Sequence, residues 1–165
     1  MNVSLIGKES GDIANAFIEE ANVEALPSKR SGWNFSWKSL GKVEGSTIYK
    51  CCKASSPHVV EGLLMLTVMN NEMLIMNNIE VSPENYGREG RYDNVAGLLI
   101  AFACYKSFEL GRGNYRGFLS FESKTSLIEL YIKKYGASYA MGNKMFFSNE
   151  AGIKLIQRYL NLNIQ

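Results

Sequence analysis

Three stretches in the middle of the chain carry apolar residues in the manner of β-strands. They span 46–54, 59–69 and 72–81, with polar or turn-forming residues between them. The second and third stretches hold near-continuous apolar runs, which is typical of central strands covered on both faces. Asn70 and Asn71 separate these two stretches, and asparagine tolerates the left-handed backbone of a tight hairpin turn. The pattern therefore predicts three antiparallel strands.

The clearest helical periodicity begins at Val95. Apolar residues recur at helical spacing from there to Leu110, and Gly111 follows, where a helix commonly ends. The segment that leads into this helix, 84–97, is polar and rich in glycine. The sequence thus predicts a strand, a polar loop and a long helix in succession.

A further strand is expected over 114–123. Because a long helix separates it from 72–81, the two strands are expected to be parallel neighbours joined by a right-handed crossover. A helix follows over 126–136, in which Ser126 and Glu129 have capping-box spacing.

The last part of the chain predicts a hairpin and an amphipathic helix. Gly142 and Asn143 mark the hairpin turn, and Asn149 is expected to cap the final helix. The first third is less regular. A helical pattern runs from Asp12 to Asn22, and Trp33, Phe35 and Trp37 then alternate as in a strand or an extended loop, where they serve packing or the wall of a cleft.

Length and composition favour one globular domain over 1–165. Hydrophobic residues make up 46% and charged residues 21% of the 165 residues, and this length suffices for a single core. The net charge of +2 is scattered rather than clustered, which makes nucleic acid an unlikely partner. Cys51 and Cys52 are adjacent and the chain holds one further cysteine, so neither a disulfide framework nor a zinc motif is expected, and no metal. No segment has the length of a membrane span, and the cytoplasm is the expected location.

The start of the helix at Val95 is the candidate site for chemistry. Helix N-termini hold unpaired N–H groups and a positive dipole end, so they bind phosphate groups. The preceding loop matches neither a Walker loop nor the Gly-x-Gly-x-x-Gly pattern. The stretch "RYDNVA", Arg91 to Ala96, resembles the pyrophosphate motif Gln/Arg-x-x-Gly-x-Gly/Ala of the GNAT superfamily of N-acetyltransferases. Asn94 stands where that motif has its first glycine, and the resemblance extends through strand, motif, helix, strand and helix over about 59–147.

This resemblance implies a fold, a cosubstrate and a set of binding groups. The fold would be α/β (α+β), with a mixed, mostly antiparallel central sheet, a splayed parallel strand pair and flanking helices. The activity would be transfer of an acetyl group from acetyl-CoA to a primary amine by direct attack. Backbone groups of Ile79, Glu80 and Val81 would pair with the pantetheine arm. The pyrophosphate would bind the N–H groups of Tyr92, Asp93, Asn94, Val95, Ala96 and Gly97, beside the positive charges of Arg88 and Arg91.

The reaction requires a proton donor for the departing thiolate and a group that manages the proton of the amine. Tyr131 resembles the acid tyrosine of the family, although its spacing to Gly136 is one residue longer than usual, which leaves Tyr135 or a structural role open. Glu80 is the candidate general base or anchor for the substrate ammonium, with a solvated surface residue as the alternative. His58, the only histidine, is expected at the surface.

Two other interpretations remain open. The first is a catalytically degenerate module that binds acyl-CoA or another protein, suggested by Asn94 and by the spacing of Tyr131. The second is an unrelated α/β domain whose glycine-rich turn is structural. The acceptor also stays open among a small polyamine or aminoglycoside-like amine, a protein N-terminus or lysine, and an aminoacyl-tRNA. A homodimer through the apolar hairpin 141–148 is a further option.

Overall fold

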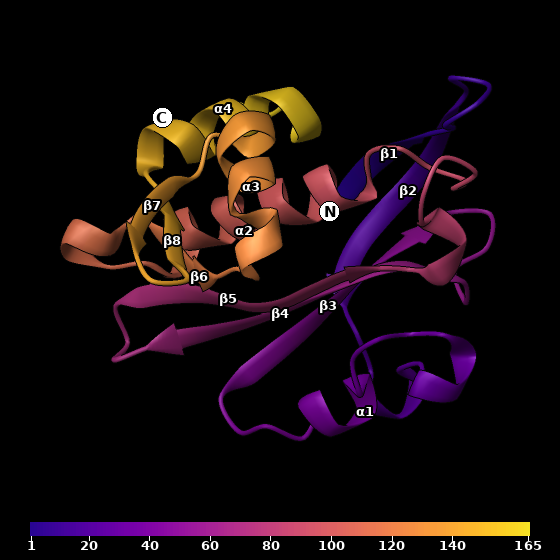
Figure 1. Cartoon of the computed structure of the whole chain (residues 1–165), viewed down its shortest axis with the longest axis horizontal. Helices are drawn as coiled ribbons and strands as arrows, with labels where there is room; N and C mark the ends of the chain where they lie inside the picture. The colour runs from indigo at the N-terminus through magenta and orange to yellow at the C-terminus, as the bar shows by residue number, and fades with distance from the viewer. The chain divides into compact units, whose positions relative to one another are not determined.

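The computed structural model describes all residues from Met1 to Gln165 (Figure 1). Eight strands form one sheet in the order β1-β2-β3-β4-β5-β6-β8-β7. The strands are β1 (Asn2–Ile6), β2 (Ile13–Glu20), β3 (Ser46–Lys53), β4 (Val60–Met69), β5 (Met73–Val81), β6 (Leu119–Glu122), β7 (Ser138–Met141) and β8 (Lys144–Phe147). The α-helices are α1 (Trp37–Leu40), α2 (Val95–Leu110), α3 (Ile128–Tyr135) and α4 (Asn149–Leu160). The 3₁₀ turns are η1 (Val23–Ala25), η2 (Lys29–Ser31), η3 (Pro83–Asn85), η4 (Gly113–Tyr115) and η5 (Thr125–Leu127). The mixed, mostly antiparallel α/β fold expected from the sequence is confirmed.

The residues cluster into two compact units. Met1–Met65 and Asn78–Leu99 form the first, and Leu66–Asn77 and Ile100–Gln165 form the second. Strands β4 and β5 and helix α2 contribute residues to both units. The expectation of a single domain over 1–165 stays a prediction.

In the first unit, β2 pairs with β1 on one side and β3 on the other, antiparallel in both cases. The prediction of a helix from Asp12 to Asn22 was wrong, because this segment is β2. Its alanines and glutamates favour a helix in isolation, but Ala16 and Ile18 are buried at alternate positions, as a strand requires. Pairing on both edges outweighs the local propensity.

The aromatic segment of the first unit serves its core. Trp33 and Trp37 are 6% and 0% exposed, and they pack with Leu26, Ile48 and Leu63. Trp37 begins the short helix α1, which lies beside β3 in Figure 1. Packing, one of the two roles expected for these aromatics, is confirmed for both tryptophans.

In the second unit, β5 and β6 form the parallel pair that the sequence predicts. Their register runs from Leu74 opposite Leu119 to Met76 opposite Phe121. Asn70 and Asn71 have φ values of 53° and 57°, so the predicted left-handed turn between β4 and β5 is confirmed.

Two predicted helix caps differ in the structure. Ser126 lies inside η5 and Leu127 precedes α3 without a side-chain cap, so the capping box at Ser126 was wrong. The cap of α4 is Ser148, whose hydroxyl accepts from the N–H of Ala151, one residue before the predicted cap. None of the helices combines the length and the apolar character that crossing a membrane requires.

Candidate functional site

The first turn of α2 carries backbone N–H groups that the helix itself does not use. Its first hydrogen bond runs from the N–H of Leu98 to the carbonyl oxygen of Asn94 at 2.9 Å. The N–H groups of Val95, Ala96 and Gly97 therefore have no acceptor within the helix. No acidic side chain lies in this turn, and the helix dipole adds a positive potential. A helix end of this kind can bind a pyrophosphate.

Strand β1 fixes the loop that leads into α2. The Nδ2 of Asn94 donates to the carbonyl oxygen of Ser4 at 2.8 Å, and its Oδ1 accepts from the N–H of Ile6 at 2.9 Å. The N–H of Asp93 donates to the carbonyl oxygen of Ile6 at 3.0 Å. The side chain and the backbone of the loop are thus both bonded to the same strand.

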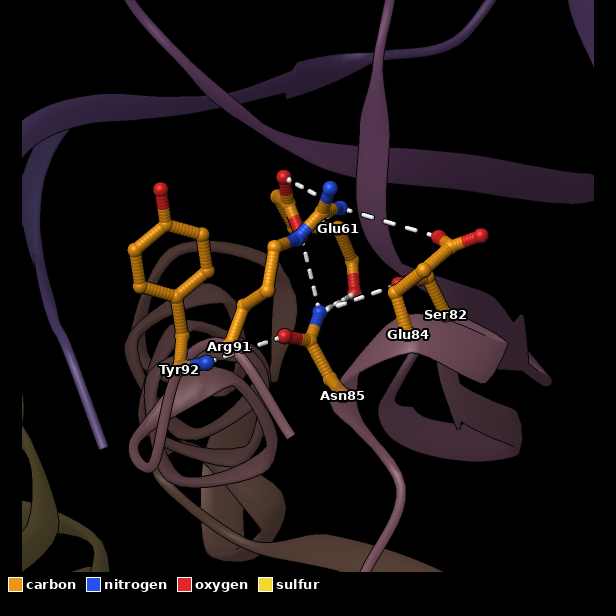
Figure 2. A network of polar contacts seen from close by, with 6 residues as sticks. All are labelled: Glu61, Ser82, Glu84, Asn85, Arg91 and Tyr92. Atoms are coloured by element: carbon orange, nitrogen blue, oxygen red, sulfur yellow. Dashed lines mark hydrogen bonds and ion pairs between the residues drawn. The ribbon is translucent and has the colours of Figure 1, made fainter. Parts of the chain in front are cut away.

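A buried polar network holds the loop through β4 and η3 (Figure 2). Asn85, only 7% exposed, is at its centre. Its Oδ1 accepts from the N–H of Tyr92 at 3.0 Å, and its Nδ2 donates to the carboxylate of Glu61 at 2.8 Å and to the hydroxyl of Ser82 at 3.0 Å. Because every polar atom of the Asn85 amide is bonded, Asn85 is itself fixed and holds the backbone of Tyr92 in place.

Arg91 neutralises the one carboxylate of this network that is almost fully buried. Its guanidinium donates to both oxygens of Glu61 at 3.0 Å, and Glu61 is 2% exposed. Glu84 approaches the same nitrogen at 3.6 Å (Figure 2). The charge of Arg91 is therefore engaged within the chain, whereas Arg88 is exposed and no side chain pairs with it. Of the two arginines expected beside the pyrophosphate, Arg88 is the one whose charge is free.

The expected N–H donors divide into two groups. Those of Tyr92 and Asp93 are occupied by Asn85 and Ile6, as described above. Those from Asn94 to Gly97 have no acceptor from the chain. We call the unpaired N–H groups from Asn94 to Gly97 the candidate cradle. This set of donors is shorter than the motif alone indicates.

Glu80, near the end of β5, is bonded rather than free. Its carboxylate accepts from the backbone N–H groups of Asn34 at 2.6 Å and Phe35 at 3.2 Å. It also accepts from the indole Nε1–H of Trp37 and the hydroxyl of Tyr86, both at 2.8 Å. Glu80 is 6% exposed, so this side chain ties the segment 34–37 to β5.

These bonds determine the protonation of the Glu80–Tyr86 pair. Burial raises the pKa of Glu80, but the hydrogen bonds from Asn34, Trp37, Tyr86 and Phe35 outweigh it, so the pKa lies below its usual value. Burial and the bond to Glu80 raise the pKa of Tyr86 to about 12. A carboxylate with a lowered pKa and four donors is a weak proton acceptor, which argues against a general-base role for Glu80.

The neighbours of Glu80 on β5, Ile79 and Val81, are half-buried. They lie beyond the parallel register with β6, which covers Leu74 to Met76 on β5. Their pairing with a pantetheine arm stays a prediction.

Tyr131 belongs to the second unit, on α3. Its ring packs against Phe121 and Tyr135, with centroids 4.8 and 6.0 Å away. No group of the chain bonds its hydroxyl, and burial raises its pKa, so the hydroxyl stays protonated at neutral pH. Tyr135 is more deeply buried, at 7% exposed. Tyr131 is therefore the more accessible of the two candidate acids.

Comparison with solved structures identifies the fold of this chain. No family model matches the sequence, and no curated protein does so. A GNAT family acetyltransferase from Elizabethkingia anophelis, solved with acetyl-CoA bound, has a TM-score of 0.57 at 14% identity, over 76% of this chain and 78% of that chain. The chain has the fold of the GNAT N-acetyltransferases. AtaTR bound with acetyl-CoA has a TM-score of 0.58 at 15% identity, over 86% and 98% of the two chains. The KacTA–DNA complex has a TM-score of 0.59 at 11% identity, over 87% and 99%.

The residues that support the candidate cradle were not predicted from the sequence. Neither Asn85 nor Glu61 belongs to the motif, and both act by holding residues that do. Glu61 does carry a signal, since a glutamate inside the apolar run 59–69 must be either exposed or paired. Asn85 carries none, because asparagine is common in polar loops.

The remaining reactive side chains of this protein, its three cysteines and its one histidine, do not form a second site. Cys51, Cys52 and Cys104 are fully buried, and burial is the main cause that raises the pKa of each thiol, that of Cys52 to about 11. Buried thiols with raised pKa values are poor nucleophiles. His58 is exposed, as expected, and lies at the edge of a cavity of about 370 Å³ that Lys50 and Leu63 also line.

Proposed function

We propose that this protein is an acetyl-CoA-dependent N-acetyltransferase. The observation that carries the proposal is the group of N–H donors from Asn94 to Gly97, free of acceptors and placed on a loop that is bonded to both β1 and Asn85. Acetyl-CoA is bound in three of the similar structures, which supports it as the cosubstrate here. A fixed set of donors binds an anion without a cost of reorganisation.

In the proposed reaction, the nitrogen of a bound primary amine attacks the thioester carbonyl carbon of acetyl-CoA. The carbon–sulfur bond breaks, the departing thiolate takes the proton of the Tyr131 hydroxyl, and solvent then reprotonates the Tyr131 phenolate. The amine releases a proton to solvent as the amide forms. Tyr131 fits the acid role because its hydroxyl is protonated and not bonded within the chain. Glu80 has a positioning role in this proposal, since it holds the segment 34–37.

The first test is binding of the coenzyme. Saturating acetyl-CoA should raise the melting temperature, because a ligand that binds only the folded state stabilises it by about 2.7 kcal/mol at a hundredfold excess over its Kd. S-acetylpantetheine lacks the pyrophosphate and should give a much smaller shift. No shift with either compound would contradict the proposal.

A pair of proline variants tests the site itself. Ala96→Pro removes an N–H donor at the second position of α2, where the helix has no acceptor for it. Glu150→Pro makes the same change at the second position of α4. Both variants should lose similar stability, and only Ala96→Pro should lose affinity for acetyl-CoA. Equal affinities for acetyl-CoA in the two variants would place the coenzyme elsewhere.

The acceptor is the next unknown, and a screen of amines identifies it. Polyamines, aminoglycosides, peptides with a free N-terminus or lysine, and aminoacyl-tRNA cover the candidate classes. Coenzyme binding without transfer to any of them would favour the alternative of a catalytically degenerate acyl-CoA-binding module. Formation of free coenzyme thiol and of the acetylated amine in equal amounts would support the enzyme.

The proposal includes a location in the cytoplasm and no DNA partner, and it leaves a homodimer open. Two similar structures are complexes that hold DNA, the KacTA–DNA and AtaT–AtaR–DNA complexes. For this chain, the scattered charge of +2 favours weak binding to DNA. Fluorescence polarisation with a labelled duplex at physiological salt tests this, and micromolar or tighter binding would contradict it.

A further inference from the structure

The backbone conformation at Asn94 does not require a glycine. Its φ angle is not among the positive values of this chain, which occur at Asn70, Asn71 and Asn161 and at eight glycines. Asn94 therefore does not adopt the left-handed backbone conformation for which glycine is favoured. The side chain of Asn94 needs another explanation, and its bonds supply one.

The amide of Asn94 bonds the outer edge of β1 in the manner of a neighbouring strand. Strand β1 is an edge strand, the first in the sheet order, with β2 on its other side. On its outer edge, the carbonyl of Ser4 and the N–H of Ile6 bond the Nδ2 and Oδ1 of Asn94. A backbone residue of a paired strand would offer the same donor and acceptor.

The backbone of the loop continues this pairing. The carbonyl of Ile6 accepts from Asp93, and the N–H of Lys8 donates to the carbonyl of Arg91 at 2.9 Å. Gly7 and Tyr92 form an isolated antiparallel bridge between these bonds. The segment 91–94 thus acts as a short added strand, and the Asn94 amide is its last contact before α2 begins.

We propose that Asn94 is a positioning residue for the coenzyme, a role that rests on the proposed function. Its amide anchors the chain directly before the free N–H groups of Val95 to Gly97. Those groups point along the axis at the start of α2, so the direction of the first turn sets where they converge. Without the amide, Ser4 and Ile6 would bond water, and the start of α2 would be held by one contact fewer. Glycine at this position, although usual in the motif, would weaken coenzyme binding in this chain.

The test compares Asn94→Ala and Asn94→Gly with the unchanged protein. Asn94→Ala removes the amide and keeps the Cβ, while Asn94→Gly installs the residue of the motif. Both variants should raise the Kd for acetyl-CoA about tenfold, which corresponds to the loss of one to two ordinary hydrogen bonds. The Kd for S-acetylpantetheine should stay within about twofold, because this compound has no pyrophosphate for the N–H groups to bind. A merely structural role would weaken both compounds alike.

The control is Asn22→Gly, which removes another asparagine bond to backbone, the one to the N–H of Glu24. It should leave both Kd values unchanged. Hydrogen exchange at the Ile6 amide measures the Asn94 contact without any ligand and should be faster in both Asn94 variants. An acetyl-CoA Kd in both Asn94 variants equal to that of the unchanged protein would overturn the inference alone. If the unchanged protein does not bind acetyl-CoA, the proposed function and this inference fall together.

Discussion

The carboxylate of Glu80 accepts a hydrogen bond of 2.8 Å from the indole Nε1–H of Trp37, which precedes it by 43 positions. The same carboxylate accepts from the backbone of Asn34 and Phe35, so a single side chain holds both ends of the segment 34–37. Gly32, which precedes this segment, has a φ of 90° and lies close to Pro83. A Cβ on Gly32 would be 3.1 Å from the Pro83 ring. The start of α1 therefore depends on β5 for its position.

Glu80→Gln should destabilise the protein by about 1–3 kcal/mol, because it replaces a charged acceptor and leaves a buried donor without a partner. Glutamine keeps the shape but offers one acceptor oxygen, and its NH₂ group faces the donors of Asn34 or Trp37. Urea unfolding followed by tryptophan fluorescence measures the loss. Glu44→Gln, on an exposed residue, is the control and should change stability by less than about 0.5 kcal/mol. Equal stability of the two variants would remove Glu80 from the structural role.

The Glu80–Tyr86 pair predicts how stability depends on pH. Since the pKa of Glu80 is lowered by folding, its contribution is present above the unfolded value of about 4.5 and is lost as pH falls through the folded pKa. The difference in stability between the unchanged protein and Glu80→Gln should therefore shrink below about pH 4.5. A difference that stays constant from pH 7 to pH 3 would contradict the lowered pKa.

Tyr86 predicts the opposite behaviour at high pH. Its pKa rises on folding from 10.0 to about 12. The contribution of its protonated hydroxyl is complete below pH 10 and is lost as pH rises through about 12. Tyr86→Phe should therefore weaken the fall in stability between these two values. Thermal melts of both proteins across this range provide the measurement, and parallel curves would contradict the assignment.

The parts of the fold that the sequence predicted are those with long, strongly apolar patterns. The apolar runs around Leu64 and Leu74 and the periodicity from Val95 to Leu110 cannot be placed well in any other way. The N-terminal strand β2 could not be found, because its alanines and glutamates favour a helix and its partners β1 and β3 are known only from the tertiary structure. Local composition decides an element only where tertiary pairing agrees with it.

The candidate site divides in the same way. The unpaired N–H groups of Val95 to Gly97 follow from one local feature, the start of a helix at Val95, so the sequence is sufficient to predict them. The partners of this loop lie far away in sequence, since Asn94 bonds Ser4 across 90 positions and Arg91 bonds Glu61 across 30. Contacts at such distances leave no periodic trace, which is why the role of Asn94 was visible only in the structure.

Arg91 and Glu61 should behave as a coupled pair. Arg91→Met leaves the buried Glu61 carboxylate with Asn85 as its remaining side-chain partner, and it should cost about 2–4 kcal/mol, less than a fully buried pair because Arg91 is partly exposed. Glu61→Gln in the same chain should restore part of this loss, because no unpaired charge then remains. Urea unfolding of the four proteins in the cycle gives the coupling energy. Additive losses would show that the ion pair contributes nothing to the loop.

Tyr131→Phe should separate catalysis from folding. The ring keeps its contacts with Phe121 and Tyr135, and the lost hydroxyl has no partner in the chain, so the melting temperature should change little. If Tyr131 protonates the departing thiolate, kcat should fall about a hundredfold while the Kd for acetyl-CoA stays the same. Tyr139→Phe, on a residue that is 54% exposed, is the matched control and should keep full activity. Because burial raises the pKa of Tyr131, the unchanged enzyme should lose activity only above about pH 10, as the hydroxyl deprotonates. A Tyr131→Phe variant with unchanged kcat would leave solvent as the proton donor and reduce Tyr131 to a packing residue.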